Sequence, residues 1–204
     1  MTSSERRNPR QQRSLERVQA ILDTASELIV EQGGASLKMA TIAQRAGVTT
    51  GSIYQYFPNT GAITRALAED YAERYRAVLK QHLEQIDSAA ELINHGKRLF
   101  SALYDMYRSD PVLKEIGLMT SIDRSLQSMD ILDSRHNAEL LFEAYRAFFE
   151  PSVQEELRRL LFLMCHLSGS AIRLSLALDA EEGDALLLTH QQMIQSRIAE
   201  LMLG

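Results

Sequence analysis

The segment from Lys38 to Leu67, KMATIAQRAGVTTGSIYQYFPNTGAITRAL, constrains the fold of this chain more than any other. Two short apolar-periodic stretches flank the turn Gly47-Val48-Thr49, and a proline follows the second stretch. Glycine adopts the positive φ that reverses a chain within three residues, and proline ends a helix. We therefore predict two short helices, over about 39–46 and 50–56, that cross closely at Ala43 as a helix-turn-helix.

The rest of the sequence also favours helices. Only four prolines and ten glycines interrupt 204 residues, and apolar residues recur at three- and four-residue spacing. We predict an all-α chain in which a three-helix head, whose first helix covers about 13–32, is joined by a long helix to a C-terminal helical body. The long helix is expected over 61–83 with Thr60 as its cap. The helices of the body are expected over 89–108, 111–119, 128–149, 153–178 and 185–203, with a turn near Gly183 before the last of them.

Charge is distributed unevenly between these parts. The chain carries −5 overall, but residues 1–65 hold eight Lys or Arg against five acids, and the remainder holds 14 against 22. A basic head on an acidic body permits a local contact with DNA phosphates, because salt screens repulsion beyond about 8–10 Å. Residues 1–12 are polar and arginine-rich, and we predict a disordered arm that either contacts DNA or stays solvated.

Two further features bear on location. The single cysteine, Cys165, cannot form an internal disulfide, and an inert buried thiol in a reducing compartment is the favoured interpretation. The longest apolar run, 160–178, is interrupted by serine, histidine and arginine, which favours a buried helix contact over a membrane span. No apolar stretch follows the arginine-rich start, so no secretory signal is visible and we expect a cytoplasmic protein.

Residues 13–72, and above all the stretch IAQRAGVTTGSIYQYFPN, closely resemble the tetracycline-repressor (TetR-type) family of bacterial transcriptional regulators. The resemblance implies that the helix over 50–56 enters the DNA major groove. Hydroxyls and free N–H groups at its start can meet phosphates or bases, Gly51 permits close approach, and Gln55 pairs well with adenine. Tyr54 and Tyr56 resemble the family's phosphate contacts, and for Tyr54 packing is an equal alternative.

One position departs from the family pattern. A lysine that usually contacts phosphate at the start of the fourth helix is replaced by Thr60, and Lys38 is a substitute cation. The candidate DNA-binding residues are therefore Lys38, Thr49, Thr50, Gly51, Ser52, Tyr54, Gln55, Tyr56 and Thr60.

The resemblance divides the chain into a helix-turn-helix domain over 13–60 and an effector-binding and dimerisation domain over 61–204. Two half-sites lie one or more helical turns of DNA apart, so two copies of the head are needed and a homodimer is expected. The interface candidates lie in the last two helices, where part of the apolar stripe must also serve as internal core: Leu160, Met164, Leu167, Ala171, Leu174, Leu187 and Ile194. The candidates for an effector pocket are Leu103, Met106, Tyr107, Phe142, Tyr145, Arg146 and His166.

We therefore predict a sequence-specific DNA-binding regulator, with repression released by a small, mainly apolar effector that favours a dimer unfit for its operator. The alternative is a ligand-independent DNA-binding protein with a structural or chromosome-organising role. A closed apolar void of a few hundred cubic ångströms would favour the first, and a solid core the second.

An enzyme is not expected, because the sequence has no phosphate loop, nucleophile elbow or paired cysteines. His136, Glu139 and Glu143 share one helical face and could recruit a metal, but a solvated polar face is the favoured interpretation. We expect no metal and no cofactor.

Overall fold

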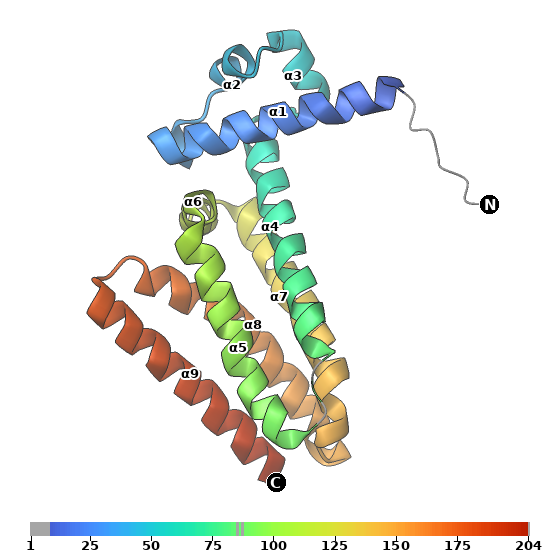
Figure 1. Cartoon of the computed structure of the whole chain (residues 1–204), viewed down its shortest axis with the longest axis vertical. Helices are drawn as coiled ribbons and strands as arrows, with labels where there is room; N and C mark the ends of the chain where they lie inside the picture. Colours follow the sequence, from blue (N-terminus) through green and yellow to red (C-terminus); the bar gives the residue numbers. More distant parts are fainter. Residues whose placement is uncertain (1–8, 85, 87, 204) are drawn as a thin grey trace, which may run out of the picture. The chain divides into compact units, whose positions relative to one another are not determined.

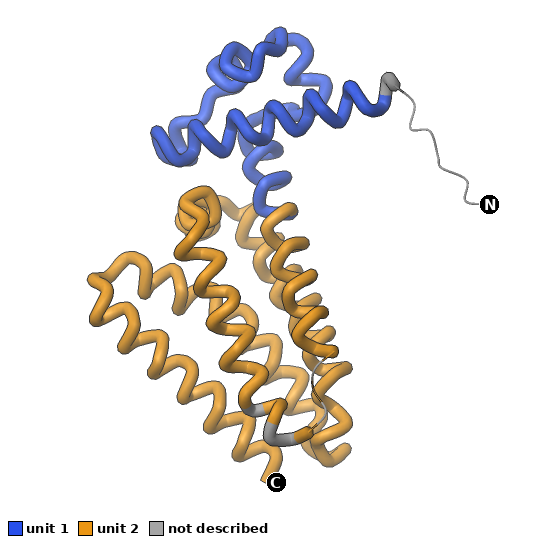
Figure 2. The backbone as a smooth tube through the Cα atoms, in the orientation of Figure 1, with its two compact units in different colours: residues 1–69 blue, residues 70–204 orange. Residues whose placement is uncertain are grey.

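A computed structural model describes residues 9–84, 86 and 88–203 (Figure 1). Every element within these ranges is a helix, and the predicted all-α fold is confirmed. The chain forms two compact units that divide between Glu69 and Asp70, within the long helix α4 (Thr60–Leu83) (Figure 2). We call them the head and the body. The domain boundary expected at residue 60 falls at the start of α4. No helix of the described residues is long and apolar enough to cross a membrane.

The head is built around one isoleucine-rich core. It contains α1 (Pro9–Gln32), a 3₁₀ turn (Gly34–Ser36), α2 (Met39–Arg45), α3 (Thr50–Tyr56) and the first turns of α4. The first helix lies across α2 and α3 (Figure 1). These helices meet through side chains with no exposed surface, namely Ile21, Ile29, Ile42, Ile53 and Ile63.

The first helix begins earlier than we expected. Residues 9–12 were assigned to the disordered arm, but α1 starts at Pro9. Proline suits the first turn of a helix because its missing N–H would have no partner there, and Gln12 Nε2 donates to Glu16 Oε1 at 3.2 Å one turn later. The rest of the predicted arm, residues 1–8, lies outside the described residues.

The body packs five further helices beside the second half of α4. They are α5 (Ala89–Ser109), α6 (Pro111–Thr120), α7 (Arg124–Tyr145), α8 (Gln154–Ser175) and α9 (Ala180–Leu203), with 3₁₀ turns at Arg146–Phe148 and Pro151–Val153. The eighth helix packs against α5, α6, α7 and α9. Its fully buried Leu157, Leu161 and Ile172 place it at the centre of the core.

Two helices of the body begin before the predicted residue because an aspartate caps each of them. Asp123 Oδ1 accepts from Ser125 N at 2.7 Å and Leu126 N at 3.0 Å, so α7 starts at residue 124 instead of 128. Asp179 Oδ1 accepts from Glu182 N at 3.0 Å, and α9 starts at residue 180 instead of 185.

The turn predicted near Gly183 is wrong. Gly183 is buried within the first turns of α9, where a Cβ atom would lie 2.6 Å from the Ser175 carbonyl oxygen at the end of α8. The absence of a side chain at Gly183 lets α8 and α9 approach closely. A glycine at such a helix contact cannot be distinguished in the sequence from a glycine in a turn.

A buried histidine is the most unusual polar group of the body core. His95 on α5 has no exposed surface, and its Nδ1 lies 2.7 Å from the Tyr145 hydroxyl. Its Nε2 has no hydrogen-bond partner among the described groups. Burial lowers the pKa of His95 to about 4, and the positive charge of Arg98 acts in the same direction.

We predict that this histidine makes the body sensitive to mild acid. The unfolded histidine gains a proton below about pH 6.5, whereas the folded one does so only near pH 4. Stability conferred by the neutral ring is therefore lost as pH falls through this window, by about 2 kcal/mol between pH 7 and pH 5. Urea unfolding at both pH values measures the free energy of unfolding. Between pH 7 and pH 5 this free energy should fall by about 2 kcal/mol less in His95→Asn than in the wild type. Exposed His136→Asn is the control, and an unchanged pH dependence in His95→Asn would contradict the assignment.

Candidate nucleic-acid interface and ligand cavity

The turn between α2 and α3 has the geometry that its sequence predicts. Gly47 has a φ of +67°, and the Val48 N–H donates to the Ala43 carbonyl oxygen at 3.0 Å. Ala43 is 1% exposed, and the fully buried Ile53 of α3 fills the space between the two helices. A residue with a side chain at position 47 would be strained in this left-handed conformation, so the glycine determines the angle at which α3 is presented.

The outward face of α3 is free of contacts within the head. Thr50, Gly51 and Gln55 are exposed. Tyr54 is 52% exposed, which favours a contact outside the chain over the packing alternative. A Cβ atom at Gly51 would meet nothing within 4 Å, so packing within the chain does not require glycine there. The missing side chain instead leaves room for a macromolecular surface to approach α3.

Two candidates on α3 also have structural contacts. Thr49 Oγ1 accepts from Ser52 N at 3.1 Å and so caps the helix, which leaves the Thr49 hydroxyl hydrogen free to donate. The Tyr56 hydroxyl accepts from Ser14 Oγ of α1 at 3.4 Å. This bond, together with Arg17, lowers the pKa of Tyr56. The hydrogen of the Tyr56 hydroxyl is likewise available to a phosphate, and the bond from Ser14 ties the hydroxyl to α1.

The basic groups of the head have different roles. Lys38 is exposed at the residue before α2 and has an extended backbone. Arg45 is paired with Glu31 at 2.6 Å and with Glu27 at 3.0 Å, so its charge connects α2 to α1. Thr60 is half-buried at the first residue of α4, and the side chain of Asn59, instead of Thr60, caps this helix by accepting from Ala62 N at 2.9 Å.

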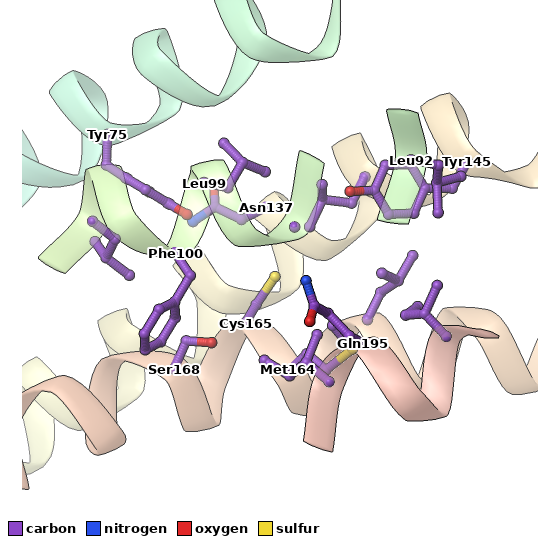
Figure 3. Close-up of a pocket in the computed structure, with 16 residues that line it drawn as sticks. Tyr75, Leu92, Leu99, Phe100, Asn137, Tyr145, Met164, Cys165, Ser168 and Gln195 are labelled. Carbon is purple, nitrogen blue, oxygen red and sulfur yellow. The ribbon is translucent and has the colours of Figure 1, made fainter. Parts of the chain in front are cut away.

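A cavity of about 80 Å³ lies in the body between α5, α7, α8 and α9, with Tyr75 of α4 at one end (Figure 3). Its volume is well below the few hundred cubic ångströms that we expected for an effector pocket. Its walls are mainly apolar, and its polar side chains are uncharged. The apolar walls include Leu92, Leu99, Phe100, Leu103, Leu141, Leu161, Met164, Ile194 and Ile198.

The polar groups at this cavity differ in how well they are paired. The Ser168 hydroxyl lies 3.2 Å from His190 Nε2, and the Tyr145 hydroxyl lies beside His95. Asn137 Nδ2 donates to Asp133 Oδ2 at 3.0 Å, but Asn137 Oδ1 has no partner among the described groups. Burial raises the pKa of the Cys165 thiol to about 12, so it is protonated at neutral pH.

Only part of the predicted pocket set lies at this cavity. Leu103 and Tyr145 line it, and Phe142 is buried in the adjoining core. The exposed Arg146 pairs with Glu143 at 3.0 Å, because α7 ends at Tyr145 and the chain turns outward there. The remaining candidates lie elsewhere: Met106 is half-buried on α5, Tyr107 lines a surface depression with Lys114 and Arg173, and His166 lines a polar cleft with Asp130 and Arg173.

The predicted interface residues divide between the surface and the interior of the α8–α9 pair. Leu167 and Leu174 are exposed, Leu160 and Ala171 are partly buried, Leu187 is buried, and Met164 and Ile194 line the cavity. Further exposed apolar side chains on α8 and α9 add to the exposed residues Leu167 and Leu174. We call this group the α8–α9 surface; it comprises Leu163 (53% exposed), Leu167 (45%), Leu174 (51%), Leu188 (54%) and Met193 (67%).

The polar face of α7 is engaged in ion pairs. Glu139 pairs with Arg158 of α8, and Glu143 pairs with Arg146. Within the described part of the chain, no three His, Cys, Asp or Glu side chains are placed to hold a metal ion.

Comparison with known proteins agrees with this arrangement. Residues 21–67 match the model of the bacterial regulatory proteins of the tetR family, and residues 87–202 match the C-terminal domain of tetracyclin repressor-like proteins. The chain therefore belongs to the TetR family of transcriptional regulators and has its helix-turn-helix DNA-binding domain. A 98-residue stretch is 30% identical to the HTH-type transcriptional regulator HbdR from Aromatoleum sp. (strain CIB). That match covers 48% of this chain and 43% of the relative.

Solved structures share the fold at low identity. The fatty acid degradation regulator FadR from Bacillus halodurans has a TM-score of 0.68 at 17% identity, over 94% of this chain and 97% of that one. RolR, solved in complex with resorcinol, has a TM-score of 0.62 at 18% identity, over 94% of this chain and 95% of that one.

We predict that a cation at position 60 strengthens DNA binding. Thr60→Lys should tighten binding to the protein's operator and steepen the dependence of log K on log salt by about one unit per protomer, because each protomer neutralises one more phosphate. Fluorescence anisotropy over a salt series measures both quantities. Thr60→Gln, which is long but uncharged, should leave the slope unchanged, and an unchanged slope in Thr60→Lys would contradict a phosphate contact at this position.

Proposed function

We propose that this protein is a dimeric repressor that binds a two-fold symmetric operator in the cytoplasm and is released by a small, mainly apolar effector. The observation that carries the DNA-binding part is the free outer face of α3, presented at a fixed angle by Gly47. The proposed contacts comprise Lys38 before α2, Thr60 at the start of α4, the cap residue Thr49 and, on α3 itself, Thr50, Gly51, Ser52, Tyr54, Gln55 and Tyr56.

Base readout is assigned to Gln55, in the last turn of α3. Gln55 is exposed, and a glutamine amide can pair in two places with an adenine edge in the major groove. The hydroxyls of Thr49, Tyr54 and Tyr56 are donors suited to phosphates, which position the helix without reading sequence.

We predict that Gln55 determines sequence preference. Selection of bound fragments from the source genome should yield a site with two symmetric half-sites. Gln55→Ala should weaken binding to that site about 10- to 100-fold for each half-site, as expected for loss of one bidentate base contact in each. Binding to unrelated DNA at low salt should be unchanged, because phosphate contacts remain. Gln32→Ala, at the exposed end of α1, is the matched control. Retention of no specific fragment at moderate salt would contradict the proposed function.

The α8–α9 surface supports dimer formation through the body. Leu163, Leu167 and Leu174 are spaced so that they share one face of α8, and Leu188 and Met193 add exposed apolar side chains on α9. Exposed apolar side chains gathered in this way are typical of a protein–protein contact. Two copies of an α8–α9 pair related by a two-fold axis would bury this surface and bring two heads into one assembly.

We predict that a charge within this surface separates the protomers. Each substitution occurs twice in a two-fold interface and removes about 1.5–3 kcal/mol of apolar burial per copy. Leu174→Glu should therefore raise the dimer dissociation constant by more than about 100-fold and weaken operator binding in parallel. Light scattering and gel filtration measure the first effect. Leu132→Glu, on the equally accessible α7 (68% exposed), should remain dimeric; a dimeric Leu174→Glu would contradict this interface.

The cavity supports effector control over a purely structural role. The cavity is smaller than the void of a few hundred cubic ångströms that we expected for effector control, but the core is not solid as the structural alternative requires, and a buried acceptor lies unpaired at the cavity wall. RolR is an example of the same fold in complex with a small phenolic molecule, resorcinol. An effector that fits this cavity only in one arrangement of the body would shift the population of dimers away from the form that binds the operator.

A further inference from the structure

The side chain of Asn137 is oriented by its neighbours so that its oxygen faces the cavity. Arg76 of α4 forms an ion pair with Asp133 Oδ1, and Asp133 Oδ2 accepts from Asn137 Nδ2 at 3.0 Å. An ionised carboxylate only accepts hydrogen bonds, so the amide must direct its NH₂ group at Asp133 and its oxygen away from it. Asn137 is 4% exposed and lines the cavity, and its Oδ1 has no partner among the described groups.

An unpaired buried acceptor is unfavourable, and native proteins rarely keep one without a use. The missing partner is a hydrogen-bond donor, which either a water molecule in the cavity or a donor group of a ligand that displaces it would supply. Figure 3 shows the Tyr75 hydroxyl directed toward Asn137, so a polar group of a ligand at this end of the cavity would meet both side chains. Burial raises the pKa of Tyr75, which keeps its hydroxyl protonated and able to donate or accept.

The cavity offers no positive charge to a ligand, and its side-chain donors are the uncharged groups of Tyr75, Tyr145, Ser168 and Gln195. None of the side chains that line it is Lys, Arg or His. The Asp133 carboxylate accepts from Asn137 at the polar end of the cavity and also contributes to the raised pKa of Cys165. A ligand carboxylate there would lose its hydration without gaining a cation and would face an acceptor that cannot donate to it.

The size of the cavity restricts the ligand to a compact molecule. A volume of about 80 Å³ exceeds the about 10–15 Å³ that one water needs and lies far below the about 300–1,000 Å³ of pockets for drug-sized ligands. At Gly96 on its wall, an added Cβ atom would meet nothing within 4 Å, so the space on this side is open. Met164 gives another wall a flexible side chain that adapts to a ligand's shape.

We propose that this cavity binds an uncharged, compact apolar molecule of about one ring that carries a hydroxyl or N–H group, with that group donating a hydrogen bond to Asn137 Oδ1. The inference rests on the proposed effector-binding role of the body and specifies the ligand class. The apolar walls of the cavity supply affinity. The unpaired Asn137 oxygen favours ligands that carry a hydrogen-bond donor over ligands of the same size and shape that lack one.

The test compares three probes of similar size on the intact chain: phenol, toluene and benzoate. With ¹³C-methyl-labelled methionine, the Met164 resonance reports occupancy of the cavity directly. Phenol should bind about tenfold more tightly than toluene, because the two differ in one hydrogen-bond donor. Benzoate should cause no saturable shift at neutral pH. Equal affinities for phenol and toluene, or saturable binding of benzoate, would overturn the proposal.

Two variants separate the donor contact from the cavity itself. Asn137→Leu keeps a similar shape without the acceptor, so toluene should still bind and the tenfold preference for phenol should fall to about one. Gly96→Leu places a side chain in the open space and should abolish binding of both probes. Thermal unfolding checks that each variant folds. If Asn137→Leu does not fold, the probe series on the wild type and on Gly96→Leu decides whether the proposal holds. Phenol binding unaffected by Gly96→Leu would overturn the proposal.

Operator binding is measured separately so that the two proposals can fail independently. A protein that prefers phenol but keeps its operator at saturating phenol supports the ligand class and contradicts release by this ligand. A protein that binds its operator specifically but shows no preference for phenol overturns the ligand class and leaves the DNA-binding function intact.

Discussion

The close crossing of α2 and α3 is the contact on which the DNA-binding face depends. The small side chain of Ala43 permits the approach, and the left-handed conformation of Gly47 reverses the chain within it. Arg45 reinforces this pair by bonding α2 to two glutamates of α1. Because none of these features uses the exposed residues Thr50, Gly51, Tyr54 and Gln55, this face of α3 remains free to contact DNA.

The body combines a packed core with the cavity between α5, α7, α8 and α9. The central helix α8 contributes side chains with no exposed surface on one side and exposed leucines on the other, so one helix serves both the core and the proposed dimer surface. Between them the cavity adjoins the group formed by Arg76, Asp133 and Asn137. This group fixes the orientation of the Asn137 amide, and the oriented oxygen of that amide underlies the proposed ligand preference.

The sequence predicted the helices well wherever periodicity marks them. The residue range of α3 was predicted without error, and α5 and α6 end one residue later than expected. The starts of α7 and α9 were missed because Asp123 and Asp179 extend them by capping, and aspartates in polar stretches are common. In the candidate site, Leu103 and Tyr145 are the two expected pocket residues that line the cavity, and Asn137, which also lines it, was not among the candidates. A single asparagine on an amphipathic helix carries no local signal of what its amide faces.

The sequence by itself determined the class of protein. The residues around Gly47 are close together along the chain, and their turn, cap and helix preferences are local properties that a linear pattern records. The tertiary structure alone decided which groups meet across helices: the close approach of Gly183 to the end of α8 and the surroundings that leave the Asn137 oxygen unpaired. Such contacts depend on side chains far apart in sequence, and on the space left between them, which no single stretch of the chain specifies.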